Sequence, residues 1–281
     1  MPTFNAADGT ELGYTLVGEG APLVCIPGGM QDSLYFEDLG GLAAHRQLVL
    51  FDLRGTGRSA VPDDPSSYRC DRLIGDLEAL REHLGLDQLD LLAHSGGTNL
   101  AQRYLEDHAD RVGKLALITP SAMAAGIDVP GEIRAEIAAL RSHEPWYAEA
   151  STALKALMAG EATADTMNAI APFSYGRWDA TTQAHHAAQA GHRNTAAFAT
   201  FVSEGAFDPP ATRAALSTFP NPVLVLAGEY DLNSPPQAVA ELADLFPDPR
   251  YVVQPGAGHY PWLDNPAGFV ATLTAFLDAG R

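Results

Sequence analysis

The sequence predicts an α/β fold: a mostly parallel sheet with helices on both faces and one helical insertion. Short apolar runs typical of buried strands alternate with stretches of helical periodicity, the pattern expected when crossover helices connect parallel strands. A long Ala-rich stretch interrupts this alternation once, after which the alternation resumes. With 281 residues, 46% of them hydrophobic and 19% charged, the chain is long enough for one large domain that carries an inserted subdomain.

The first 120 residues supply most of the expected sheet. Gly18-Glu19-Gly20 is a turn signal between the first two strands. Leucines at helical spacing, followed by the stop signal Gly85, predict a helix over residues 71–84. The apolar runs place strands at residues 11–17, 23–26, 47–51, 89–93 and 115–118.

The alternation of strands and helices stops at Pro120. From Ser121 to about Phe219 the sequence is Ala-rich and helical in character, with Pro and Gly breaks and no convincing buried strand. We therefore expect residues 121–219 to form a helical cap subdomain, and residues 1–120 and 220–281 to form the core. The core pattern resumes with a strand at 222–227, a helix at 237–245, a strand near 251–253 and a last helix at about 266–277.

The charge of the chain restricts its partners. A formal net charge of −18 at pH 7 argues against nucleic acid or an anionic membrane surface as a partner, because both require clustered Lys and Arg. No stretch approaches the roughly 18 apolar residues of a membrane span, and the first residues lack a signal-peptide pattern. Only Cys25 and Cys70 are present, which suits free thiols in a reducing compartment. We expect a cytoplasmic protein that acts on a small molecule, with its oligomeric state left open.

The stretch from Leu89 to Tyr104 has the pattern of a strand, a sharp turn and a helix. The turn reads Ala93-His94-Ser95-Gly96-Gly97, with small residues on both sides of the serine. In such an elbow a strained backbone projects the central hydroxyl above the sheet at the positive end of a helix dipole, and the flanking residues must be small. Ser95 is therefore the candidate nucleophile. The alternative is a Gly-rich turn that only allows a helix to begin.

Two further polar residues follow the ends of later strands. Asp231 closes the segment Gly228-Glu229-Tyr230-Asp231, and His259 lies in Gly256-Ala257-Gly258-His259-Tyr260. Open α/β sheets build their sites at the carboxyl ends of parallel strands, and Ser, Asp, His is the chain order expected when an acid and a base serve an elbow serine. We predict a triad of Ser95 as nucleophile, His259 as general base and Asp231 as the orienting acid.

Along nearly its whole length the chain resembles the α/β-hydrolase family. The resemblance rests on the elbow, on the segments that contain Asp231 and His259, on residues 52–59 and on the position of the cap. It implies an eight-stranded, mostly parallel sheet. It also implies an oxyanion hole formed by the backbone N–H groups of Gly29 and Gly96.

One branch of that family is more similar than others in a single segment. Asp52-Leu53-Arg54-Gly55-Thr56-Gly57-Arg58-Ser59 looks like the prolyl-iminopeptidase-like branch. That branch usually shows Gly-Gly-Pro-Gly in the oxyanion loop and Gly-Gly before the serine. Here Pro27-Gly28-Gly29-Met30 and Ala93-His94 differ from both patterns.

These residues predict a serine hydrolase that cleaves a small ester, lactone or thioester through an acyl-enzyme, without a metal or a redox cofactor. A prolyl-iminopeptidase-like aminopeptidase or amidase is one alternative. A non-hydrolytic enzyme of the same fold, such as a lyase or an acyltransferase, or a binding protein is another. The intact triad and both glycine donors favour hydrolysis.

Substrate contacts are harder to predict, because aromatic residues in a small helical subdomain are often its core. His185, His186 and His192 lack the Cys or carboxylate spacing of a metal site and fit a polar helix face better. Glu204 lies near Phe201 and Phe207, where it is a candidate for holding a substrate's ammonium group, although an acidic chain also scatters carboxylates over its surface. The candidate substrate-binding residues are His94, Tyr175, Trp178, Phe201, Glu204 and Trp262.

Overall fold

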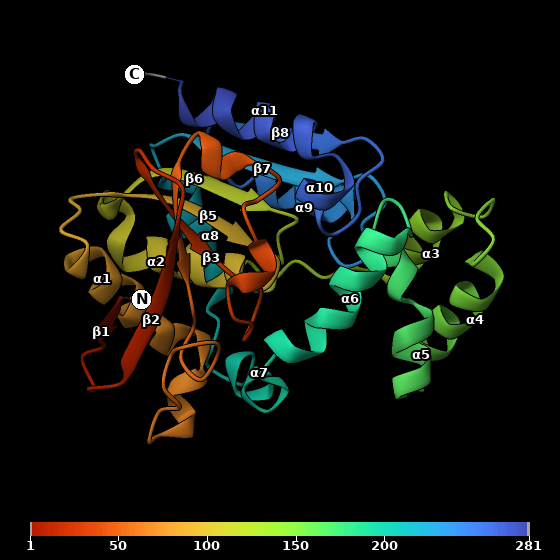
Figure 1. Cartoon of the computed structure of the whole chain (residues 1–281), viewed down its shortest axis with the longest axis horizontal. Helices are drawn as coiled ribbons and strands as arrows, with labels where there is room; N and C mark the ends of the chain where they lie inside the picture. The colour runs from red at the N-terminus through yellow and green to blue at the C-terminus, as the bar shows by residue number, and fades with distance from the viewer. Residues whose placement is uncertain (1, 280–281) are drawn as a thin grey trace.

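The computed structural model describes residues 2–279 and has one central sheet of eight strands (Figure 1). The strand order is β1-β2-β4-β3-β5-β6-β7-β8; β1 pairs antiparallel with β2, β2 pairs antiparallel with β4, and all other pairs are parallel. The predicted fold class, an eight-stranded and mostly parallel sheet, is confirmed. The strands are β1 (Thr3–Asn5), β2 (Glu11–Val17), β3 (Pro22–Ile26), β4 (Gln47–Phe51), β5 (Leu89–His94), β6 (Val112–Ile118), β7 (Val223–Gly228) and β8 (Pro249–Gln254).

The central strands are buried on both faces, which explains their continuous apolar runs. Along β3, Val24 and Ile26 belong to one hydrophobic cluster, whereas Leu23 and Cys25 belong to the cluster on the opposite face. Strand β1 has no sequence pattern that predicts it, because only Phe4 of its three residues is buried and so short a strand shows no alternation.

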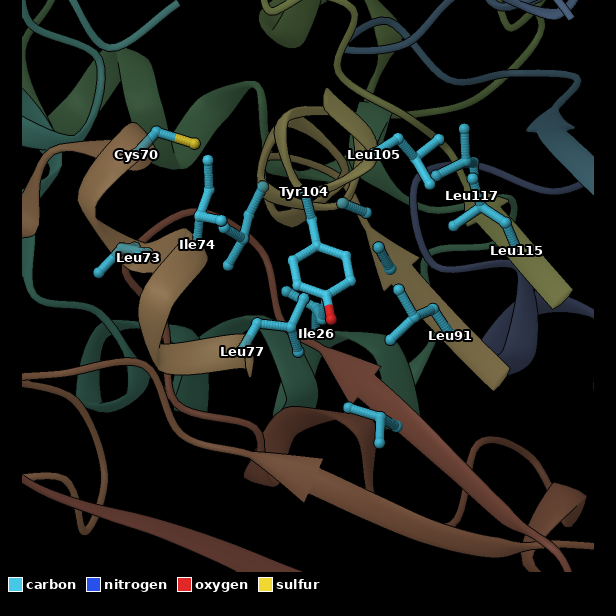
Figure 2. Packing of buried hydrophobic residues seen from close by; sticks show 14 of the residues in the cluster. Ile26, Cys70, Leu73, Ile74, Leu77, Leu91, Tyr104, Leu105, Leu115 and Leu117 are labelled. Atoms are coloured by element: carbon cyan, nitrogen blue, oxygen red, sulfur yellow. The ribbon is translucent and has the colours of Figure 1, made fainter. Parts of the chain in front are cut away.

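Helices cover both faces of the sheet. Apolar residues of α1, α2, α8 and α9 join the first cluster, part of which Figure 2 shows around Tyr104 and Leu77. Residues of α10, α11 and two 3₁₀ turns join the second cluster. The predicted helix at 71–84 is divided into a 3₁₀ turn over Cys70–Leu73 and α1. The helices of the core are α1 (Ile74–His83), α2 (Gly97–His108), α8 (Pro209–Thr218), α9 (Pro236–Ala243), α10 (Pro261–Asp264) and α11 (Pro266–Leu277).

Five helices lie between β6 and α8 in the sequence, and three of them, α3, α4 and α5, extend to one side of the sheet in Figure 1. They have a small hydrophobic cluster of their own, which includes Leu154 and Phe173 and which Leu232 of the loop after β7 joins. No helix between residues 2 and 279 combines the length and apolarity needed to cross a bilayer. The five are α3 (Gly131–Ala139), α4 (Tyr147–Met158), α5 (Ala164–Ala169), α6 (Ala180–His192) and α7 (Thr195–Phe201).

The range predicted for the cap, residues 121–219, includes a helix that packs on the sheet layer. Leu216 of α8 is fully buried in the cluster that α2 also joins, and the Thr212 hydroxyl donates a hydrogen bond to Glu106 of α2 at 2.6 Å. The Ala-rich sequence of α8 does not differ from that of the helices before it, so only its tertiary contacts reveal that it packs on the sheet layer.

Candidate active site

Ser95 stands at a sharp turn between β5 and α2. Its backbone φ is 52°, in the left-handed region that a non-glycine residue rarely adopts. The neighbouring glycines are required by close contacts: a Cβ on Gly97 would lie 2.0 Å from the carbonyl oxygen of Pro27, and a Cβ on Gly96 would lie 2.7 Å from the amide nitrogen of Gly29. The sequence folds into an elbow here because only small residues let α2 begin so close to the loop after β3.

The structure brings Ser95, His259 and Asp231 together in one hydrogen-bonded chain. The Ser95 Oγ is 2.8 Å from Nε2 of His259, and Nδ1 of His259 is 2.7 Å from Oδ2 of Asp231. Because a carboxylate only accepts, Nδ1 carries the proton that it donates to Asp231, and Nε2 is left to accept from the serine hydroxyl. This is the tautomer that a general base needs.

Asp231 is held in place by its own loop. It is fully buried, and its Oδ1 accepts hydrogen bonds from the backbone N–H groups of Asn233 at 2.8 Å and Ser234 at 3.1 Å. Each carboxylate oxygen therefore has a donor, and Oδ2 is fixed in the direction of His259. Such satisfied, buried groups have little freedom to reorient.

Gly96 packs directly against the loop of Gly29, since a Cβ on Gly96 would lie 2.7 Å from the amide nitrogen of Gly29. Two rings close one side of this position, since a Cβ on Gly29 would approach Phe198 to 3.0 Å and Phe201 to 3.2 Å. Phe201, a predicted substrate contact, is fully buried. The two glycines predicted to supply the oxyanion donors therefore lie close together, with aromatic rings next to Gly29.

His94 lies beneath the elbow and not in the open site. It is buried, its Nε2 donates to the carbonyl oxygen of His259 at 2.9 Å, and its Nδ1 accepts from the hydroxyl of Tyr35 at 2.7 Å. Burial, together with the nearby His259, holds the pKa of His94 well below its usual range, so the ring is neutral. Tyr35 in turn accepts the backbone N–H of Gly28 at 2.8 Å. A continuous chain of hydrogen bonds thus joins the loop of Gly29 to the loop of His259.

The C-terminal end of α6 is tied to the same loop. The backbone N–H of Asp32 donates to the carbonyl of His192 at 2.8 Å, and Nδ1 of His192 is 2.8 Å from Oδ1 of Asp32. The backbone N–H of Asn194 donates to the carbonyl of Met30 at 2.9 Å. Gln31 adds a side-chain hydrogen bond to Gln189 at 2.9 Å.

The predicted aromatic residues have different surroundings. Tyr175 is fully buried, donates to or accepts from Nδ1 of His185 at 2.9 Å, and stacks on Tyr260 with ring centroids 5.1 Å apart. Trp262 is also fully buried, with its ring 4.9 Å from that of His94. Trp178 is partly buried and lies 5.6 Å from Tyr175 between ring centroids. Tyr175 and Trp262 thus contact Tyr260 and His94, the two rings that pack directly against His259.

Glu204 is exposed on the loop after α7, so the structure does not place it in a closed pocket with the triad. Among residues 2–279 no group of three His, Cys, Asp or Glu side chains is arranged to hold a metal ion. The sequence does not identify Tyr35 or Tyr260 as site residues. Nothing near Tyr35 distinguishes it from a core aromatic residue, and the one local signal for Tyr260 is its position directly after His259.

Comparisons with known proteins agree with this architecture. The family model for the alpha/beta hydrolase fold matches residues 21–266. The sequence is 29% identical over 275 residues to a proline iminopeptidase of Levilactobacillus brevis, covering 92% of this chain and 88% of that protein.

Two solved structures illustrate the similarity in three dimensions. The esterase RhEst1 from Rhodococcus sp. ECU1013 superimposes with a TM-score of 0.75 at 24% identity, covering 99% of this chain and 98% of that one. The enol-lactonase from Burkholderia xenovorans LB400 superimposes with a TM-score of 0.68 at 26% identity, covering 98% and 99%.

Proposed function

The chain belongs to the α/β-hydrolase fold family and is a serine hydrolase, and we propose that it cleaves a carboxylic ester, lactone or thioester bond of a small molecule through an acyl-enzyme on Ser95. The observation that carries the proposal is the unbroken chain from Asp231 through His259 to Ser95, at an elbow flanked by two backbone donors. The proposed compartment is the cytoplasm, where the buried thiols of Cys25 and Cys70 would stay reduced.

The proposed reaction has two halves. In the first, Oγ of Ser95 attacks the substrate carbonyl carbon while Nε2 of His259 takes the hydroxyl proton, and the N–H groups of Gly29 and Gly96 hold the oxyanion. The carbon–oxygen or carbon–sulfur bond to the leaving group then breaks, and His259 returns the proton to that group. In the second half a water molecule repeats the attack on the acyl-enzyme, which releases the acid and restores Ser95.

Asp231 has a fixed role in both halves. Its carboxylate keeps the proton on Nδ1 of His259 and stabilises the imidazolium that forms when Nε2 is protonated. The two backbone hydrogen bonds that Asp231 accepts keep its carboxylate oriented toward His259 while Nε2 gains and loses the proton.

An aminopeptidase acting on an N-terminal proline is the second candidate, favoured by the similarity to a proline iminopeptidase over most of both chains. Such an enzyme must desolvate a substrate ammonium group, which requires a carboxylate nearby. Glu204, the carboxylate considered for this purpose, is exposed to water. Ester or lactone cleavage is therefore the first choice.

A direct comparison of substrates tests the proposal. We expect a fluorophosphonate to label Ser95 and a short-chain p-nitrophenyl ester to give a burst of p-nitrophenol, the sign of an accumulating acyl-enzyme. The ester should exceed prolyl p-nitroanilide in kcat/KM by more than leaving-group reactivity explains. Efficient prolyl anilide cleavage that collapses in Glu204→Gln would favour the aminopeptidase instead.

A further inference from the structure

A cavity of about 280 Å³ lies between the cap and the loop that carries the catalytic acid. Its volume lies just below the range typical for small-molecule sites, roughly 300–1,000 Å³. Three polar residues, Arg134, Ser174 and Asn233, interrupt an otherwise apolar lining. The apolar residues are Leu154, Leu157, Met158, Ile170, Phe173 and Leu232.

The cavity wall touches the supports of two members of the triad. The backbone carbonyl of Ser174 accepts the N–H of His259 at 2.8 Å, and the N–H of Asn233 donates to Asp231 at 2.8 Å. Two residues of the cavity wall are therefore bonded directly to the segments that carry the base and the acid.

Arg134 is an unusual cation for this chain. Acidic residues outnumber Lys and Arg by 35 to 17, and the fully buried arginines Arg54 and Arg141 are paired with Asp76 and Glu144. The half-buried Arg134 forms no ion pair within residues 2–279, and its one side-chain hydrogen bond runs from Nη1 to the carbonyl of Leu232 at 2.6 Å.

The guanidinium of Arg134 therefore has unused binding capacity. It carries five N–H donors and remains charged, even though burial lowers its pKa against the opposing effect of Asp231. Asp231 acts on Arg134 only electrostatically: its carboxylate accepts hydrogen bonds from His259, Asn233 and Ser234, and within residues 2–279 it forms no ion pair with Arg134.

We propose that this cavity is a subsite for the anionic end of the substrate: the bound ester or lactone carries a short apolar chain that ends in a carboxylate, and Arg134 pairs with that carboxylate. The inference rests on the proposed hydrolase function and specifies its substrate class. The apolar lining holds the chain, and the one cation at the wall selects the charged end.

Two esters that differ only in this charge test the proposal: the mono-p-nitrophenyl ester of adipic acid and the p-nitrophenyl ester of hexanoic acid. We expect Arg134→Gln to lower kcat/KM for the adipate ester about tenfold or more, the loss expected for a charged hydrogen bond, and to change the hexanoate ester less than about threefold. Arg250→Gln is the matched control, because Arg250 is exposed on β8 and also has no ion pair among residues 2–279.

A second variant tests the cavity independently of the charge. Leu157→Phe adds volume at the half-buried lining, so it should reduce kcat/KM for both six-carbon acyl groups while sparing the acetate ester. Equal effects of Arg134→Gln on the charged and neutral esters, in a protein that melts like the wild type, would overturn the proposal. The proposal would also be overturned if Leu157→Phe left the ratio of kcat/KM between the six-carbon esters and the acetate ester unchanged.

Failure of the proposed function would look different, since no ester would then be cleaved by the wild type. In that event calorimetric titration still tests whether the cavity binds a carboxylate. Hexanoate should bind the wild-type chain at least about tenfold more tightly than hexan-1-ol, and Arg134→Gln should remove that preference. Equal affinities for the acid and the alcohol would contradict the subsite.

Discussion

The elbow and the cap differ in how closely neighbouring atoms pack around their residues. At the elbow, the glycines pack closely against the backbone of the loop after β3, and a single added methyl group at Gly97 would collide with the carbonyl oxygen of Pro27. In the cap, the buried cluster is small, and even α6, whose end is bonded to the loop of Gly29, has open space within 4 Å of the position that a Cβ on Gly191 would take. The triad residue Ser95 therefore lies on a closely packed element, whereas the cap contains positions where a larger side chain fits without a clash.

The largest expected effect comes from the elbow itself. Ser95→Ala should reduce ester turnover at least about a thousandfold, as the loss of a nucleophile does, while the melting temperature changes little. Steady-state kinetics and thermal melting check both statements. Substantial residual activity, or labelling by a fluorophosphonate at another serine, would move the active centre away from the elbow.

The clash at Gly97 provides the next test of rigidity. Gly97→Ala forces a methyl group against the backbone of Pro27, so we expect a loss of about 1–3 kcal/mol in the free energy of unfolding, the range typical of overpacking. Because the displaced loop contains Gly29, ester turnover should fall as well. Denaturant unfolding and kinetics give the two readouts, and an unchanged variant would show that the elbow yields more easily than its contacts indicate.

His94 tests whether the supports of the base matter for catalysis. His94→Ala leaves the hydroxyl of Tyr35 and the carbonyl of His259 each short of one partner, so kcat should fall about tenfold, less than for His259→Ala. KM should change less than kcat, because the lost contact orients the base. Equal losses in the two variants, both folded, would give His94 a role beyond positioning.

The junction between cap and core has a titratable group of its own. Burial raises the pKa of Asp264 to about 6, against the stabilising effect of the backbone N–H groups of Gly258 and Gly176. Its pKa is about 3.8 when unperturbed, so above pH 6 the folded chain carries a costly buried charge, and the folded state takes up a proton first as the pH falls.

As the pH falls from 6 to about 4, protonation of Asp264 should raise the free energy of unfolding by up to about 3 kcal/mol, at 1.36 kcal/mol per pKa unit. Asp264→Asn should remove that contribution, so its melting temperature relative to the wild type should be higher at pH 8 than at pH 4. A constant difference across this range would mean that the carboxyl group is not buried in solution.

The smallest effect is expected in the cap. Gly191→Ala in α6 meets no atom within 4 Å and no left-handed backbone, so the helix should gain up to about 1 kcal/mol through reduced chain entropy. Turnover should be unchanged. Thermal melting beside Gly97→Ala gives the comparison directly, and a destabilised variant would reveal contacts that α6 makes only in solution.

The sequence could predict the sheet and the triad positions because both depend on short-range patterns. Ser95 stands among small residues, and Asp231 and His259 follow apolar runs, so local sequence alone places all three at one edge of the sheet. The roles of Arg134 and Tyr35 could not be predicted, since each is defined by a partner it has or lacks far along the chain. The same holds for α8, whose attachment to the sheet layer is a tertiary contact.

The attachment of α6 to the loop of Gly29 has a consequence for protein engineering. Hydrogen bonds join Asp32, Met30 and Gln31 of this loop to the end of α6 and to Asn194 just after it. This part of the cap is therefore held in place by the core. Helices α3 to α5, by contrast, have no such ties to the oxyanion loop among the hydrogen bonds of residues 2–279. A graft of a new specificity module should therefore replace α3 to α5 and leave the junction at 189–194 intact, since exchanging the whole insertion would also remove the hydrogen bonds that hold the loop of Gly29, the proposed oxyanion donor.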